Sequence, residues 1–159
     1  MRLTPKLNRL LRLCKNTSIA VSIAPLVGCV YLPETPPNHV TLNDFTTDGC
    51  SLFPDGSFEQ PQVWCHCCIA HDKVYWSGGT KEQRRDADLA LKQCVATTGH
   101  PSIAHLMWLG VRAAGSPNLS TSFRWGYGWP YLRPYQALSI EEEAMVKEKM
   151  QKYENGQLK

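Results

Sequence analysis

Apolar residues recur at the three- and four-residue spacing of a helix in three stretches along the middle of the chain. The predicted helices cover residues 62–76, residues 81–95 and the stretch that follows Pro101 up to the break at Gly115. Polar residues fill the positions between the apolar ones, so each helix should bury one face. The pattern therefore predicts a mainly α fold.

Helix ends are marked by their own residues. Ser77-Gly78-Gly79 should stop the first helix, and Thr80-Lys81-Glu82-Gln83 has the form of a capping box that begins the second. Ser139-Ile140-Glu141-Glu142 is another capping box, and it begins a helix that runs to about Tyr153. That last helix carries acids first and lysines last, which is typical of a solvated face.

The first 28 residues have the charge order of an export signal, with five basic residues, no acid and then a short apolar run. The run closes with Leu26-Val27-Gly28-Cys29, which resembles the bacterial lipobox, where the leader is cut before a cysteine that then carries lipid. We expect an exported protein of the bacterial cell envelope, anchored through Cys29. An ordinary secretory leader, giving a periplasmic or secreted protein, and an apolar helix with a chance cysteine are the alternatives.

Removal of the leader changes the charge of the protein. Twelve of the 17 basic residues then remain against all 14 acids, so the net charge moves from +3 to about −2. No basic stripe is left to bind nucleic acid, which we exclude as a partner. The predicted segments are a signal peptide at 1–28, a proline-rich tether at 29–44, one domain at 45–137, and a C-terminal helix and tail at 138–159.

The first predicted helix concentrates the chemically active side chains. Because positions four apart share a helix face, Cys67, His71 and Tyr75 form one stripe. Cys68 and Asp72 form a second stripe about 100° away. Each stripe thus combines a cysteine with a side chain that is common in catalysis.

Two other segments can meet these stripes. Asp88 and Cys94 on the second helix can meet the first stripe, and Cys50 in the preceding loop can meet the second. In an oxidising compartment this suggests two disulfides. They are Cys67–Cys94 and Cys50–Cys68. The bonds would bring Asp88 to His71 and the loop carbonyls to Asp72.

The resulting groups suit hydrolysis. A carboxylate bonded to one imidazole nitrogen leaves the other nitrogen free to take a proton from water. A carboxylate with backbone carbonyls is an oxygen-only set, which suits calcium. The sequence therefore predicts a water-activating dyad beside a cation, acting on esters or phosphoesters.

The stretch Cys67-Cys68-Ile69-Ala70-His71-Asp72-Lys73-Val74-Tyr75 resembles the C-C-x-x-H-D-x-C-Y signature of secreted phospholipases A2. The stretch 87–94 is similar to the family's later C-D-x-x-x-x-x-C helix. The family's remaining cysteines at these positions are Val74 and Ala87 here, so one disulfide is lost as a pair. The resemblance covers roughly residues 48–95. It implies a core of two disulfide-linked helices with a preceding calcium loop, to which this chain adds C-terminal helices.

The resemblance also implies roles for particular residues. His71 would deprotonate a water, Asp88 would orient His71, and Tyr75 would bond Asp88. Calcium on Asp72 would bind the phosphate and the oxyanion formed at the sn-2 ester of a phospholipid at a membrane surface. The implied carbonyl ligands are those of Gly49, Ser51 and Phe53. In place of the family's glycine-rich loop this chain has D-G-C-S-L-F-P-D-G at residues 48–56. Asp48 or Asp55 is therefore an alternative ligand.

Three other interpretations stay open. A phospholipase-like protein could bind lipid or a partner without turnover, and a disulfide-linked helical domain could carry His71 and Asp72 as surface groups only. Zinc on Cys65-His66-Cys67-Cys68 and His71 is the third, although five ligands on one helix cannot converge. Cys65 has no evident partner, so it is free or pairs between molecules. The aromatic segment 123–131 either covers a small core or meets a lipid interface.

Overall fold

The computed structural model describes residues 41–157 of the chain. The expected signal peptide, Cys29 and most of the tether lie outside these residues. The last tether positions belong to the packed fold, because Leu42 is buried and the amide of Asn43 donates to the carbonyl of Gly128 over 2.8 Å. The packed region therefore begins before residue 45.

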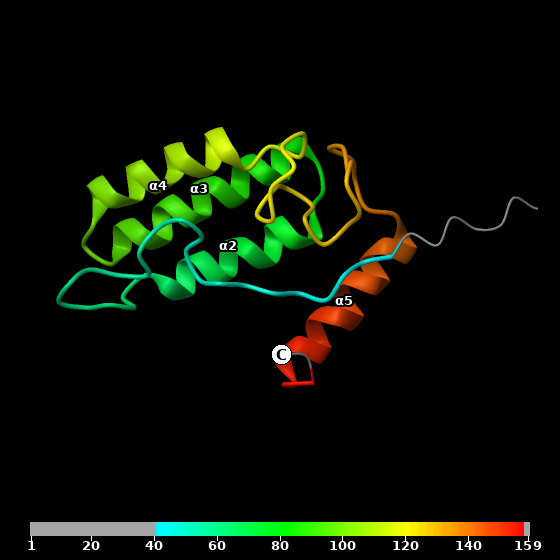
Figure 1. The fold of residues 1–159 in the computed structure, drawn as a ribbon, viewed down its shortest axis with the longest axis horizontal. Helices are drawn as coiled ribbons and strands as arrows, with labels where there is room; N and C mark the ends of the chain where they lie inside the picture. The colour runs from blue at the N-terminus through cyan, green and yellow to red at the C-terminus, as the bar shows by residue number, and fades with distance from the viewer. Residues whose placement is uncertain (1–40, 158–159) are drawn as a thin grey trace, which may run out of the picture. The chain divides into compact units, whose positions relative to one another are not determined.

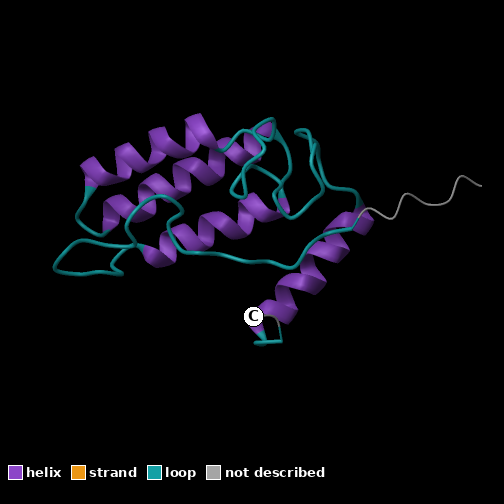
Figure 2. Cartoon of the chain, in the orientation of Figure 1, coloured by secondary structure: helices purple, strands orange, loops and turns teal. Residues whose placement is uncertain are grey.

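Four helices make up the regular structure of the described residues, which contain no strand (Figures 1 and 2). They are α2 (Cys65–Ser77), α3 (Lys81–Thr97), α4 (Pro101–Ala114) and α5 (Ile140–Glu154). The mainly helical prediction is confirmed. Within residues 41–157, no helix combines the length and the apolar character that crossing a bilayer requires.

The predicted helix starts hold where a capping box marks them. At Thr80 the hydroxyl accepts from the amide of Gln83, whose side chain accepts from the amide of Thr80, and Ser139 and Glu142 repeat the arrangement. The expected start of α2 at residue 62 is wrong by three residues. Trp64 has no capping side chain, and its amide bonds the carbonyl of Asp55 instead, so the preceding loop continues to the first turn of the helix.

The two predicted disulfides are present. Cys67–Cys94 joins α2 to α3 with Cα atoms 5.7 Å apart, and Cys50–Cys68 joins the loop to α2 at 5.0 Å. α3 packs against both α2 and α4 (Figure 1). The helix that carries the histidine is thereby fixed against the helix that carries the aspartate.

The aromatic segment buries two tryptophans against the end of α2. The indole nitrogen of Trp125 donates to the carbonyl of Gly79 over 2.9 Å, and that of Trp129 donates to the carbonyl of Ser77 over 2.7 Å. Both indoles are almost fully buried. The segment therefore caps the carbonyl end of α2, while Tyr131 is half exposed.

One face of α5 packs on the core. Its apolar residues contact a buried cluster of Leu42, Phe45, Trp76 and Trp129. The buried carboxylate of Glu142 accepts two hydrogen bonds from Arg133, at 2.7 and 2.8 Å. The predicted solvated face covers only the remaining side of this helix.

Candidate active site

His71 and Asp88 meet inside the contact between α2 and α3. Nε2 of His71 lies 3.0 Å from Oδ1 of Asp88, and both side chains are buried. An ionised carboxylate only accepts hydrogen bonds, so Nε2 carries the proton in this pair. Nδ1 then carries no proton and keeps its lone pair, which is the state that a general base requires, and Oδ1 of Asp72 lies 4.0 Å from it.

Tyr75 completes this group from one turn further along α2. Its hydroxyl donates to Oδ1 of Asp88 over 2.7 Å, and its ring lies 4.1 Å from the ring of His71 between centroids. Burial and the charge of Asp88 raise the pKa of Tyr75, so the hydroxyl stays protonated. Tyr75 therefore acts here as a hydrogen-bond donor to the carboxylate.

Two arginines that the sequence analysis missed complete the surroundings of Asp88. Nη1 of Arg112 donates to Oδ2 over 2.7 Å, and Nε of Arg84 lies 3.8 Å from the same oxygen. Arg84 also donates to the Tyr75 hydroxyl over 3.0 Å. A sequence signal existed for both, because Arg84 precedes Asp88 by one turn and Arg112 is the single charged residue of the apolar helix α4.

The charges around the dyad act on both partners. Burial alone would raise the pKa of Asp88, but hydrogen bonds from His71, Tyr75 and Arg112 outweigh it and lower the pKa. For His71, burial lowers the pKa, and the carboxylates of Asp72 and Asp88 outweigh it and raise the pKa above 6.5. The carboxylate of Asp88 is therefore ionised at neutral pH.

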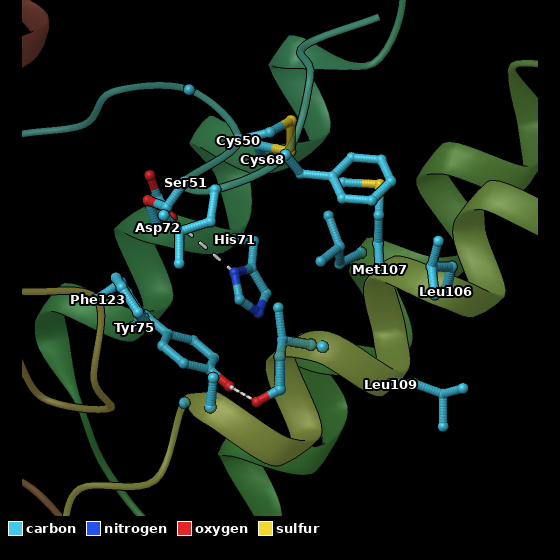
Figure 3. A pocket seen from close by; sticks show the side chains of 18 residues that line it. Cys50, Ser51, Cys68, His71, Asp72, Tyr75, Leu106, Met107, Leu109 and Phe123 are labelled. Atoms are coloured by element: carbon cyan, nitrogen blue, oxygen red, sulfur yellow. Dashed lines mark hydrogen bonds and ion pairs between the residues drawn. A yellow bond between two sulfur atoms is a disulfide. The ribbon is translucent and has the colours of Figure 1, made fainter. Parts of the chain in front are cut away.

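An apolar pocket of about 340 Å³ opens beside His71 (Figure 3). His71, Asp72 and Tyr75 lie at its lining together with the loop residues Gly49 and Ser51. The remaining lining is mostly apolar and comes from the loop, α3, α4 and the segment after α4, and includes Leu52, Phe53, Leu91, Leu106, Met107, Leu109, Val111 and Phe123. The imidazole of His71 thus lies at the side of a cavity that suits a hydrocarbon chain.

A second, polar cavity of about 250 Å³ also has Asp72 in its lining. Thr47, Asp48, Ser51 and Asp72 line it with oxygen atoms. The Thr47 hydroxyl donates to Oδ2 of Asp72 over 2.6 Å. Hydroxyl and carboxylate oxygens are the kind of ligand that calcium prefers. Asp48 and Asp72 are the carboxylates of this lining, and no group of three carboxylates comes together among residues 41–157. Backbone oxygens of the loop would therefore have to contribute.

The loop distinguishes the two carboxylates that could assist Asp72. Oδ1 of Asp55 accepts from the amide of Cys50 over 2.8 Å, and a side chain at Gly49 would collide with Asp55. Gly49 also has a φ of 82°, a conformation that favours glycine. Asp55 therefore holds the loop together, whereas Asp48 lines the polar cavity with Asp72.

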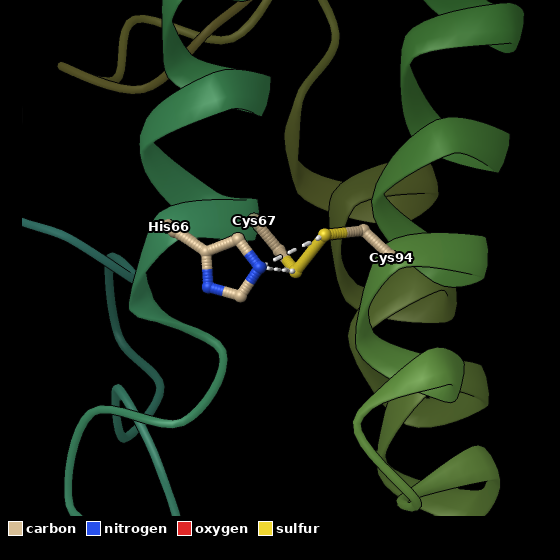
Figure 4. A group of neighbouring side chains, drawn as sticks. All are labelled: His66, Cys67 and Cys94. Carbon is tan, nitrogen blue, oxygen red and sulfur yellow. Dashed lines mark hydrogen bonds between the residues drawn. A yellow bond between two sulfur atoms is a disulfide. The ribbon is translucent and has the colours of Figure 1, made fainter.

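The cysteines next to His66 do not form a thiolate site. Nε2 of His66 lies 3.4 Å from the sulfur of Cys67 and 3.6 Å from that of Cys94 (Figure 4). These two sulfurs are bonded to each other, so neither is a thiolate that could bind zinc. Cys68 is bonded to Cys50, which leaves Cys65 as the free cysteine of the described residues.

Comparisons of the chain with models of protein families, with curated proteins and with solved structures found no match.

Proposed function

We propose that the protein hydrolyses the sn-2 ester of glycerophospholipids in a calcium-dependent reaction, with a water activated by His71. The observation that carries this proposal is the hydrogen bond between Nε2 of His71 and Asp88, because it leaves Nδ1 unprotonated on a histidine that lines an apolar pocket. A base oriented in this way can take a proton from a water that attacks an ester carbonyl.

His71, Asp88 and Tyr75 would each have a separate role in the transfer of the proton from water. His71 accepts the proton of the attacking water, and Asp88 stabilises the imidazolium that results. Tyr75 holds the carboxylate by a hydrogen bond. The apolar pocket takes the acyl chain, which places the ester beside His71.

Asp72 and the oxygens of the loop would hold the cation. The candidates for the loop are the carbonyls of Gly49, Ser51 and Phe53 and the carboxylate of Asp48. Calcium bound there would supply positive charge for the lipid phosphate and for the oxyanion of the transition state. An envelope location with an anchor at Cys29 would keep this site near a phospholipid surface.

Fatty-acid release from mixed phospholipid vesicles tests the proposal. His71→Gln should abolish release by the mature protein in the presence of calcium, because the amide cannot accept a proton from water. His105→Gln is the matched control, since His105 is an exposed histidine on α4. Equal loss in both variants, or loss in neither, would contradict the assignment of His71 as the base.

A second candidate function is lipid binding without turnover. Asp48 accepts from the hydroxyl of Ser51 over 2.6 Å and Asp55 accepts from the amide of Cys50, so the loop satisfies its carboxylates without a cation. Tight binding of a fatty acid to a protein that neither binds calcium nor releases fatty acid would favour this candidate.

A further inference from the structure

The carboxylate of Asp88 uses its two oxygens for different partners. Oδ1 accepts the hydrogen bonds of His71 and Tyr75, which both come from α2. Oδ2 accepts a hydrogen bond from Arg112, which comes from α4. The group that His71 depends on is therefore held from a third helix.

We infer that Arg112 is a positioning residue of the dyad, which fixes the plane of the Asp88 carboxylate so that Oδ1 faces Nε2 of His71. This role rests on the proposed function of His71 as a base. A fully buried carboxylate without a paired cation is unstable in a low-dielectric interior, and it reorients or takes up a proton. The guanidinium of Arg112 opposes both, because it supplies charge and, among the described residues, the one arginine hydrogen bond to this carboxylate, at 2.7 Å, whereas Nε of Arg84 stays 3.8 Å from Oδ2.

Arg84 has a different part in the same group. Its Nη2 donates to the carbonyls of Val111 and Arg112, at 2.8 and 3.0 Å. These carbonyls lie in the last turn of α4, and that of Val111 also accepts from the amide of Gly115 over 2.9 Å. Arg84 thus anchors the backbone of the residue whose side chain reaches Asp88.

The two arginines differ in how well they tolerate replacement. Arg84 is 4% exposed and makes bonds to four residues, so its loss should impair folding. The side chain of Arg112 is 31% exposed, so a replacement can leave the helix packing intact. Arg112 is therefore the residue to test.

The test compares Arg112→Met, which removes the charge, with Arg112→Lys, which keeps it. Arg85→Met is the matched control, because it changes the net charge equally and Arg85 pairs only with the exposed Asp86. We expect Arg112→Met to lower kcat about 10- to 100-fold, as loss of an outer partner does in other sites, with KM nearly unchanged. Arg112→Lys should recover part of kcat, and Arg85→Met should match the unmodified protein.

A second readout follows the hydrogen bond itself. The proton on Nε2 of His71 should give a downfield resonance in the proton NMR spectrum, identified by its absence in His71→Gln. We expect this resonance to broaden or disappear in Arg112→Met and to persist in Arg85→Met. If the unmodified protein releases no fatty acid but the His71 resonance still disappears in Arg112→Met, the positioning role is upheld and the hydrolytic function is refuted.

Unchanged kcat together with an unchanged His71 resonance in a folded Arg112→Met protein would overturn the inference. A loss of kcat in Arg112→Met with the resonance intact would overturn it as well, because Arg112 would then act elsewhere than on the dyad.

Discussion

Asp88 shows how a buried charge is kept in this protein. It has no exposed surface, yet each of its oxygens has a partner, from His71, Tyr75 and Arg112. A buried carboxylate is tolerated under these conditions, since the hydrogen bonds replace those lost from water. The same bonds define which nitrogen of His71 carries the proton.

Asp88→Asn tests that arrangement. An amide in place of the carboxylate presents an NH₂ group to partners that are themselves donors, which disfavours the Nε2–H form of His71. We expect kcat to fall about 10³- to 10⁴-fold, as for a triad in which the aspartate becomes asparagine. The assay is fatty-acid release by protein that retains its helical circular dichroism spectrum, and a decrease of less than tenfold would speak against an orienting role for Asp88.

The helices and their cysteines could be predicted because their determinants are local. Apolar spacing and capping boxes depend on neighbouring residues, and the four-residue period alone separates Cys67 from Cys68. Arg112 could not be assigned to Asp88, because the two residues are 24 positions apart and meet only when α3 packs on α4. The caps that Trp125 and Trp129 provide were missed for the same reason, since residues between α4 and α5 follow no period.

The two disulfides hold different parts of the site, so removal of each one should have a different effect. Replacement of both Cys67 and Cys94 by Ser should lower the free energy of unfolding by about 2–5 kcal/mol and also lower kcat, because the bond fixes the two helices that carry the dyad.

Replacement of both Cys50 and Cys68 by Ser should instead weaken calcium binding more than it lowers kcat at saturating calcium, because this bond holds the loop. Urea unfolding and calcium titration calorimetry measure the two effects. Identical effects of both double replacements would show that the bonds have only a general stabilising role.

The ion pair between Arg133 and Glu142 fixes α5 to the segment that precedes it. Hydrogen bonds from Arg133 lower the pKa of Glu142 below 4.5, so the folded protein holds this carboxylate ionised at a pH where the unfolded chain is protonated. The stability that the pair contributes is present above pH 4.5 and is lost as the pH falls through the lowered pKa.

Glu142→Gln should therefore lower the free energy of unfolding at neutral pH by about 1–3 kcal/mol, the range for hydrogen bonds to charged groups. The variant should also lose less stability than the unmodified protein when the pH falls from about 5 to about 3. Urea unfolding at a series of pH values measures both. Parallel stability curves for the two proteins would contradict the role of this pair.

The folded domain places an apolar pocket and a polar cavity next to Asp72. Ser51, Asp72 and Phe123 line both. A molecule with an apolar chain and a polar headgroup suits such a pair of cavities, and the phospholipid substrate that we propose has this chemistry. Exposed leucines of the pocket lining, Leu52, Leu106 and Leu109, would then contact the lipid surface.

Leu106→Asp tests this contact. The change should reduce fatty-acid release from vesicles about tenfold or more, because a leucine side chain contributes about 1.5–3 kcal/mol on burial. Hydrolysis of a soluble short-chain ester should change little. Leu119→Asp is the control, since Leu119 is also exposed but lies outside the pocket lining. Equal losses on both substrates would place Leu106 in the reaction and not at the lipid surface.

The measurement that tests the central claim most directly is release of a labelled fatty acid from the sn-2 position of vesicle phospholipid, followed across a calcium titration and again with chelator. We predict release that saturates with calcium, stops with chelator, and is absent at every calcium concentration in His71→Gln. Release that is indifferent to both calcium and His71→Gln would contradict the account.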